Sequence, residues 1–155
     1  MIMYCLDTSA LLEAAVRSYP MDVFPTLWEH LDEMIAQGEL LSPDEVLEEL
    51  KKKDDALFAW AGQRPMLFYP LDSPLQLVVR DEILATFPRL VDSKKNRSQA
   101  DPFVVGLAKM TGRIVVTSEK HSGTVENPKI PNVCDHFRIR CISLLQLIRD
   151  QGWNF

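Results

Sequence analysis

Four acidic side chains stand where a strand or a helix is expected to begin or end, and carboxylates placed in this way could hold a metal ion. They are Asp7, Glu49, Asp101 and Glu119. Two unit charges about 4 Å apart repel by roughly 4 kcal/mol at an effective dielectric of 20, so a fold that gathers carboxylates normally binds a divalent cation among them. The pattern therefore favours a hard-metal site and hydrolytic chemistry.

Asp7 directly follows the short apolar run 3–6, which is typical of a buried strand. Its carboxylate would lie at the carboxyl end of that strand, where open α/β sheets bind their ligands. Aspartate is also a preferred N-cap, and a helix is expected to begin near Ser9. A ligand role and a capping role are both open for Asp7 on this pattern.

Glu45, Glu48 and Glu49 compete for one role on a helix that is expected to end in the lysine run 51–53. Ser42, followed three residues later by Glu45, predicts a capping box at the helix start, which would explain Glu45 structurally. At about 100° per residue, Glu49 borders the apolar face, whereas Glu45 and Glu48 are expected to be solvated. We therefore predict that Glu49 is the ligand, with Glu45 in reserve.

Asp101 precedes Pro102 and would be a good N-cap, but the helix expected over 102–110 is apolar almost all round. A carboxylate at the mouth of a buried helix is costly without a partner, and this cost favours a ligand role. Glu119 follows the strand expected over 113–117, a position where an acid is often only a surface residue.

Hydroxyl and basic side chains near these acids could support the same site. Thr8, Thr117 and Ser118 could hydrogen-bond a carboxylate or a metal-bound water, although ordinary turn chemistry also explains such hydroxyls. Several cations could contact substrate phosphates, with a solvated surface as the alternative interpretation. These cations are Lys94, Lys95, Arg97 and Lys120.

Hydrophobic periodicity and helix-stop signals predict strands that alternate with helices. Strands are expected over 3–6, 40–41, 113–117 and 137–142, and helices over 11–16, 24–37, 43–53, 55–61, 75–87, 102–110 and 143–150. The stretches 92–99 and 120–136 are expected to be loops. Alternation of this kind is typical of an α/β sandwich with a largely parallel central sheet flanked by helices.

The bulk composition predicts one globular domain over 1–155 and excludes some classes of function. A net charge of −5 argues against a protein that coats DNA. Cys5, Cys134 and Cys141 show no metal-site spacing and fit free thiols in a reducing cytoplasm, with Cys5 and Cys141 in the core. No apolar run reaches the length of a membrane span and no signal peptide is evident, so a cytoplasmic protein is expected.

The segments around the four acids resemble the motifs of PIN-domain nucleases, especially the VapC-like toxins of prokaryotic toxin–antitoxin pairs. The segments are residues 6–12, 46–50, 100–102 with Ala108, and 116–119. The resemblance covers about residues 3 to 142. Glu119 departs from the family pattern, in which aspartate is more usual, so at this position action through a water is implied rather than direct coordination.

The resemblance implies a PIN-like three-layer sandwich and an endoribonuclease that hydrolyses RNA with Mg²⁺ or Mn²⁺. Asp7 and Asp101 would be direct metal ligands, Glu49 would come next, and Glu119 would position a water or a second ion. Magnesium dehydrates reluctantly, so few carboxylates and several waters would suffice to hold it. The resemblance also implies a homodimer that a cognate antitoxin keeps silent.

Three other functions fit parts of the pattern. An inert RNA-binding or protein-interaction module could share the fold, but a module that binds polyanions gains nothing from gathered negative charge. A phosphatase of the haloacid-dehalogenase type would need a second aspartate two residues after Asp7, where Ser9 stands. A receiver-like phosphoacceptor would need an adjacent acid pair near the first strand, which is missing.

Overall fold

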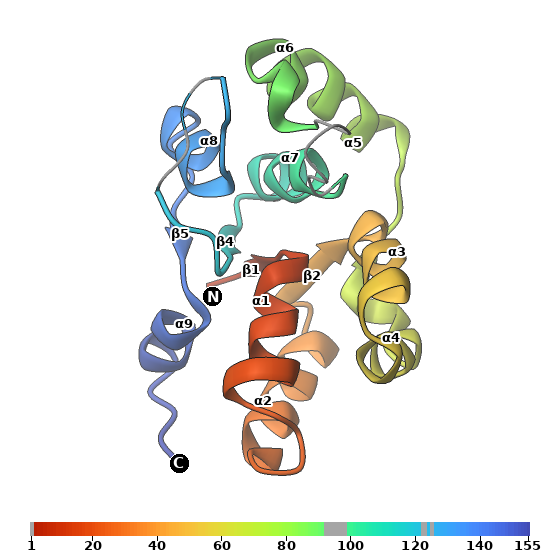
Figure 1. Cartoon of the computed structure of the whole chain (residues 1–155), viewed down its shortest axis with the longest axis vertical. Coiled ribbons are helices and arrows are strands. Elements are labelled where there is room, and N and C mark those ends of the chain that lie inside the picture. The colour runs from red at the N-terminus through yellow and green to blue at the C-terminus, as the bar shows by residue number, and fades with distance from the viewer. Residues whose placement is uncertain (1, 92–98, 122–123, 125) are drawn as a thin grey trace.

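A five-stranded, all-parallel sheet forms the centre of the molecule and carries helices on both faces (Figure 1). The structure is a computed structural model and describes residues 2–91, 99–121, 124 and 126–155. The strands are β1 (Tyr4–Leu6), β2 (Leu40–Pro43), β3 (Phe68–Tyr69), β4 (Ile114–Val116) and β5 (Cys141–Ile142). The predicted α/β sandwich with a parallel sheet is confirmed.

The connections between the strands supply the helical layers. In Figure 1, α1 and α2 lie below the sheet, whereas α5, α6 and α7 lie above it. The α-helices are α1 (Thr8–Leu12), α2 (Pro25–Ala36), α3 (Asp44–Lys53), α4 (Asp55–Gly62), α5 (Ser73–Val78), α6 (Leu84–Thr86), α7 (Asp101–Thr111), α8 (Ile130–His136) and α9 (Leu144–Asp150). Other helical turns are η1 (Glu13–Ser18), η2 (Pro65–Leu67), η3 (Val79–Ile83) and η4 (Pro88–Leu90).

The strand order β3-β2-β1-β4-β5 reverses direction between β1 and β4. The chain runs outward from β1 through β2 to β3, then returns to place β4 on the other side of β1. Open α/β sheets bind ligands outside the carboxyl ends of the strands at such a switch point. Asp7 follows β1 and Thr117 follows β4, so these two residues flank that point.

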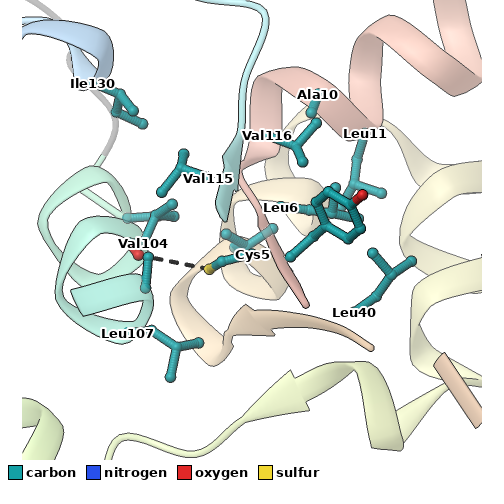
Figure 2. Close-up of a cluster of buried hydrophobic side chains, with 14 of the residues drawn as sticks. Cys5, Leu6, Ala10, Leu11, Leu40, Val104, Leu107, Val115, Val116 and Ile130 are labelled. Carbon is teal, nitrogen blue, oxygen red and sulfur yellow. Dashed lines mark hydrogen bonds between the residues drawn. The ribbon is translucent and has the colours of Figure 1, made fainter. Parts of the chain in front are cut away.

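Helices cover both faces of β1 and β4 (Figure 1), which explains why these strands are apolar on both faces. Figure 2 shows Cys5 of β1 between β4 and α7, with its thiol directed at the backbone of Val104. The Cys5 thiol donates a hydrogen bond to the Val104 carbonyl at 3.6 Å, and burial raises the pKa of this thiol. Cys5 is therefore a core residue, as predicted, while Cys141 is only partly buried.

Arg113 ties the strands together at the amino edge of the sheet, opposite the candidate site. Its Nη1 donates to the carbonyls of Tyr4 at 3.3 Å and Glu39 at 3.1 Å, and its Nη2 donates to the carbonyl of Gly38 at 3.0 Å. Gly112, which precedes it, ends α7 in the left-handed conformation at φ 69°. The turn from α7 into β4 thereby delivers the guanidinium to this edge.

Two sequence predictions about secondary structure are wrong. Residues 120–136 are not a continuous loop, because α8 occupies Ile130–His136. Pro131 reads as a loop signal, but proline is tolerated in the first turn of a helix, where its missing N–H costs nothing. The short strand β3 was not predicted, and its two residues pair with Ser42 and Pro43 of β2.

Candidate carboxylate site at the switch point

Asp7 is the most deeply enclosed acid of the site, with 2% of its surface exposed. Its Oδ1 accepts the backbone N–H of Ala10 at 2.7 Å, so Asp7 caps α1 as the sequence allowed. The Ser9 hydroxyl lies 2.8 Å from both carboxylate oxygens, and the Thr117 hydroxyl donates to Oδ2. The three donors make four contacts with the carboxylate, two to each oxygen, because the Ser9 hydroxyl lies near both.

The loop after β4 orients the hydroxyls of Ser9 and Thr117 toward Asp7. The backbone N–H of Ser118 donates to the Ser9 hydroxyl at 3.0 Å, and the N–H of Glu119 donates to the Thr117 hydroxyl at 3.1 Å. Each hydroxyl oxygen is therefore occupied as an acceptor, and its proton is left for the carboxylate. Segments more than a hundred residues apart in sequence are joined in this way across the switch point.

Burial raises the pKa of Asp7 to about 7, against the opposing effect of its hydrogen bonds to Thr117, Ala10 and Ser9. The negative charge of Glu119 raises it further. Desolvation outweighs three favourable hydrogen bonds, so the ionised carboxylate is poorly compensated in the protein alone. A cation bound to the carboxylate would relieve that cost.

Glu49 belongs to the same site through Thr8. The Thr8 hydroxyl donates to Glu49 Oε1 at 2.8 Å, which links α3 to the residue next to Asp7. Both side chains come from helices that begin at the carboxyl edge of the sheet. The predicted juxtaposition of Glu49 with Asp7 is consistent with this geometry.

Glu45 lies differently from the sequence prediction. Ser42 ends up in β2 and donates its hydroxyl to the Leu6 carbonyl at 2.8 Å, so no capping box with Glu45 forms. Proline at position 43 is the N-cap of α3, and Glu45 is half-buried rather than solvated. Burial raises the pKa of Glu45, with a smaller contribution from Asp44. The capping explanation was wrong because Ser42 belongs to β2, and its hydroxyl bonds the adjacent strand instead of the helix start.

One oxygen of Glu45 is buried without a hydrogen-bond partner among the described residues. A buried polar atom without a partner costs roughly 1–3 kcal/mol, more when it is charged. Glu45 stands one helical turn before Glu49 on α3, toward the carboxyl edge. The reserve residue of the sequence analysis is therefore a stronger candidate ligand than its pattern indicated.

Glu119 is tied to α8. Its Oε2 accepts the backbone N–H of Ile130 at 2.8 Å, which satisfies the first donor of that helix. Pro131 has no N–H to satisfy, so one acid suffices to close this part of the helix start. Glu119 thus has a structural role that the sequence could not reveal while α8 was taken for a loop.

Asp101 is buried and is the first residue of α7, but it is not the N-cap, a position that Ala100 holds. The capping interpretation was therefore wrong. Because α7 ends directly before the amino end of β4, its first turn lies toward the carboxyl edge of the sheet. The topology places Asp101 at the same edge as Asp7.

The basic side chains fall into two groups. Lys94, Lys95 and Arg97 lie outside the described residues. Lys120 is exposed directly after Glu119 and lines two cavities beside the site.

The chemistry of these donors suits a hard cation, although the site is not a closed metal cage. Among the residues that the structure describes, no three histidine, cysteine or acidic side chains converge closely enough to bind one ion. Mg²⁺ does not require such a cage, since it is usually held by one or two carboxylates and several waters. Asp7, a buried carboxylate, and Glu45, with an oxygen that has no partner among the described residues, have the chemistry for that kind of binding.

Ser9 and the backbone N–H of Ala10 are the site groups that the sequence analysis missed. Both lie within three residues of Asp7, and the preference of aspartate for helix N-caps was the available signal. The N–H group of Ile130 could not have been found, because it depends on α8.

The fold and the site together define an α/β domain with buried and half-buried carboxylates at the carboxyl edge of a parallel sheet. A family profile described as "Domain of unknown function (DUF4411)" matches residues 4–155, so the chain belongs to this family. Among solved structures, the crystal structure of PAE2754 from Pyrobaculum aerophilum is similar over 98% of this chain and 91% of that chain, at 18% identity and a TM-score of 0.44. A search of curated proteins finds no match.

Proposed function

We propose that this domain is a metal-dependent endoribonuclease that hydrolyses RNA phosphodiester bonds. The observation that carries the proposal is Asp7, a buried carboxylate at the switch point whose pKa burial raises to about 7. A protein does not gain stability by burying an acid in this way, and strongly perturbed acids are found preferentially at functional sites. The resemblance to PIN-domain nucleases points to the same residue.

In this proposal Asp7 and Asp101 bind the cation directly, and Glu49 and Glu119 hold its waters. Mg²⁺ or Mn²⁺ at this position would lower the pKa of a bound water and offset charge on the attacked phosphate. Ser9 and Thr117 hold the Asp7 carboxylate in one orientation. Thr8 positions Glu49, and the N–H of Ile130 fixes one oxygen of Glu119, so the other oxygen can accept a proton from water.

The proposal extends to a biological role as the toxin of a toxin–antitoxin pair, acting as a homodimer in the cytoplasm. No helix within the described residues has the length and apolar character to cross a membrane. Expression of the chain alone in a bacterial host should arrest growth, and Asp7→Asn should relieve the arrest. Co-expression of the cognate antitoxin should relieve the growth arrest as well. Equal growth arrest by the chain and by Asp7→Asn would contradict the toxin role.

The test of the nuclease is cleavage of a panel of structured and unstructured RNAs by the purified protein in EDTA, Mg²⁺ or Mn²⁺. Asp101→Asn is the test variant, prepared identically, and it should retain the fold and lose at least about a hundredfold in rate. Asp81→Asn is the matched control, because Asp81 is an exposed acid paired with Arg80 on η3. Cleavage that persists in Asp101→Asn would identify a contaminant or a wrong site.

An inert binding module on the same fold is the second candidate. It is favoured by the structural partners of the acids, since Asp7 caps α1 and Glu119 satisfies the first N–H of α8. If none of the RNAs is cut, calorimetry with Mn²⁺ separates the two candidates. Heat of Mn²⁺ binding that disappears in Asp101→Asn would support a nuclease with a narrow substrate range. Absence of Mn²⁺ binding would support the inert binding module.

A further inference from the structure

A groove beside the switch point has the composition of a nucleotide-binding surface. It is a cavity of about 430 Å³ between η1, the end of β4 and the start of α9. Thr117 and Ser118 lie in its wall, and both contact the Asp7 cluster. The groove is therefore continuous with the candidate site rather than a separate depression.

Two cations line the groove, one from η1 and one from the segment after β4. Arg17 projects from η1, with 60% of its side chain exposed, and Lys120 follows β4 and is also exposed. Arg17 pairs with Glu13 at 3.0 Å, an exposed ion pair of the kind that contributes little to stability. A phosphate could take the guanidinium from Glu13 at small cost, particularly since Ser18 also donates to Glu13 at 2.7 Å.

Between the cations the groove presents apolar and aromatic surface. Leu145 is 45% exposed at the start of α9, although it is a large apolar side chain. Tyr19 is held in place because its ring packs edge-on against Phe24 and its carbonyl accepts the indole N–H of Trp28 at 2.8 Å. A rigid aromatic edge and an exposed leucine next to cations match a ligand that carries both phosphate and a planar base.

The groove continues beyond Lys120. A second cavity of about 170 Å³ shares Thr117, Ser118, Lys120 and Ser143 with the first and extends to Glu119 and His121. Lys120 therefore stands between two connected hollows, where it could contact the phosphate that links two nucleotides. A path of this length on one side of the acids is suited to a strand rather than to a single small molecule.

We propose that the groove between η1 and α9 binds an unpaired nucleotide next to the cleaved bond, with phosphates on Arg17 and Lys120 and the base against Tyr19 and Leu145. This inference rests on the proposed nuclease function and adds the surface that holds the nucleotide beside the cleaved bond. In a duplex the bases are stacked and paired, so their faces are not available to Tyr19 and Leu145.

The test measures binding separately from cleavage. The fluorescence anisotropy of a short, labelled oligouridylate is followed in EDTA, so that metal-dependent cutting cannot interfere. Arg17→Gln and Lys120→Gln should each weaken binding about three- to tenfold and should each reduce the salt dependence, d log K/d log [salt], by about 0.7. The matched control is Arg80→Gln, because Arg80 is also exposed and also paired with an acid, but stands on η3.

Two further variants probe the chemistry of the groove. Leu145→Ala should weaken binding by about threefold, whereas Leu77→Ala, at an equally exposed leucine of α5, should not. Glu13→Gln should tighten binding, because it removes the competitor for Arg17. Tighter binding after loss of an acid is not expected if Arg17 and Glu13 act only as a surface ion pair.

The outcomes of the binding and cleavage tests can be separated. Equal affinity of Arg17→Gln, Lys120→Gln and Arg80→Gln would overturn the groove, as would a duplex that binds as tightly as the single strand. If the groove variants change binding but no RNA is cut and Mn²⁺ does not bind, the proposed nuclease activity is wrong and the proposed groove is retained. If RNA is cut and these variants leave KM unchanged, the groove fails and the nuclease stands.

Discussion

Asp7 combines burial, several hydrogen bonds and a raised pKa in one side chain. Three donors converge on its carboxylate, yet burial still raises the pKa of Asp7 to about 7. The folded protein therefore holds a proton on Asp7 at a pH where the unfolded chain has released it. The stability of the domain is thereby coupled to pH through one side chain.

The sign of that coupling predicts how Asp7→Asn behaves. The unfolded carboxyl ionises near 3.8 and the folded one near 7, so the native state binds more protons between these values and loses stability as pH rises through them. In EDTA, the unfolding free energy of the wild type relative to Asp7→Asn should fall by about 2–3 kcal/mol between pH 5 and pH 8. Urea denaturation at both pH values measures it, and a constant or rising difference would contradict it.

The three glutamates of α3 allow a second prediction at this scale. Glu45→Gln should reduce Mn²⁺ affinity about tenfold or more, as Glu49→Gln should, because Thr8 holds Glu49 next to Asp7 and Glu45 stands one turn before Glu49 with an oxygen that has no partner among the described residues. Glu48→Gln is the control, since Glu48 is exposed on the same helix. Calorimetry measures the affinities. In EDTA, Glu45→Gln should leave the melting temperature unchanged or raise it, because it removes a buried charge without a partner.

Much of the site could be predicted from residue types and local positions. An acid after an apolar strand placed Asp7, and helix periodicity singled out Glu49. Glu45 was misjudged because Ser42 was assigned to a helix cap, while its hydroxyl bonds Leu6 across the sheet. That bond joins residues 36 apart in sequence, and no local pattern carries information about it.

At the scale of elements, a single substitution at Gly106 can test the close contact between α7 and η3. A Cβ on Gly106 would lie 2.8 Å from Cγ2 of Val79, and valine is too stiff at χ1 to move aside cheaply. Glycine in the middle of a helix is otherwise unfavourable. The close approach of η3 therefore explains why glycine is needed at this position of α7.

Gly106→Ala should consequently destabilise the domain by about 1–3 kcal/mol despite the better helix propensity of alanine. Val79→Ala removes the obstructing methyl, so in that background Gly106→Ala should cost much less or become stabilising. A double-mutant cycle by urea denaturation gives the coupling between the two positions. Additive effects would mean that the two elements do not press on each other as described.

Helix α8 is an element that the sequence pattern predicted as a loop. Pro128, Pro131 and Gly123 indicate a loop, and only Ile130 to His136 forms a helix. The start of this helix depends on the Glu119 carboxylate, which arrives from the end of β4. Pro131 in the first turn and the Asn132 side chain, which accepts the N–H of Lys129 at 3.3 Å, are local signals of this helix. The Glu119 contact, by contrast, cannot be recognised from the helix's own residues.

For the whole molecule, the switch point between β1 and β4 explains why acids from distant segments lie at one edge. The alternation of strands and helices was sufficient to predict a parallel sheet, and hence a common carboxyl edge. The strand order was not predictable, because it depends on which strand β4 pairs with after the long excursion through α5 and η3.

A cation bound at this edge should stabilise the entire fold. At a concentration one hundred times Kd, preferential binding to the native state contributes about 2.7 kcal/mol, which for a domain of this size corresponds to a rise in Tm of about 5–10 °C. Thermal denaturation with and without Mg²⁺ or Mn²⁺ measures this shift. Asp101→Asn should reduce it and Asp81→Asn should not. An unchanged Tm at saturating metal would argue against the site.

The clamp at the opposite edge has a consequence for mutational tolerance. Arg113 binds the carbonyls of Tyr4, Gly38 and Glu39, and every one of these acceptors is a backbone atom. Side-chain substitution at Glu39 leaves its carbonyl in place and so spares the clamp, whereas Gly38 needs its left-handed φ of 74° and Tyr4 is buried in the core. The three hydrogen bonds all depend on one donor, Arg113. A saturation library should therefore show tolerance at position 39 and intolerance at position 113.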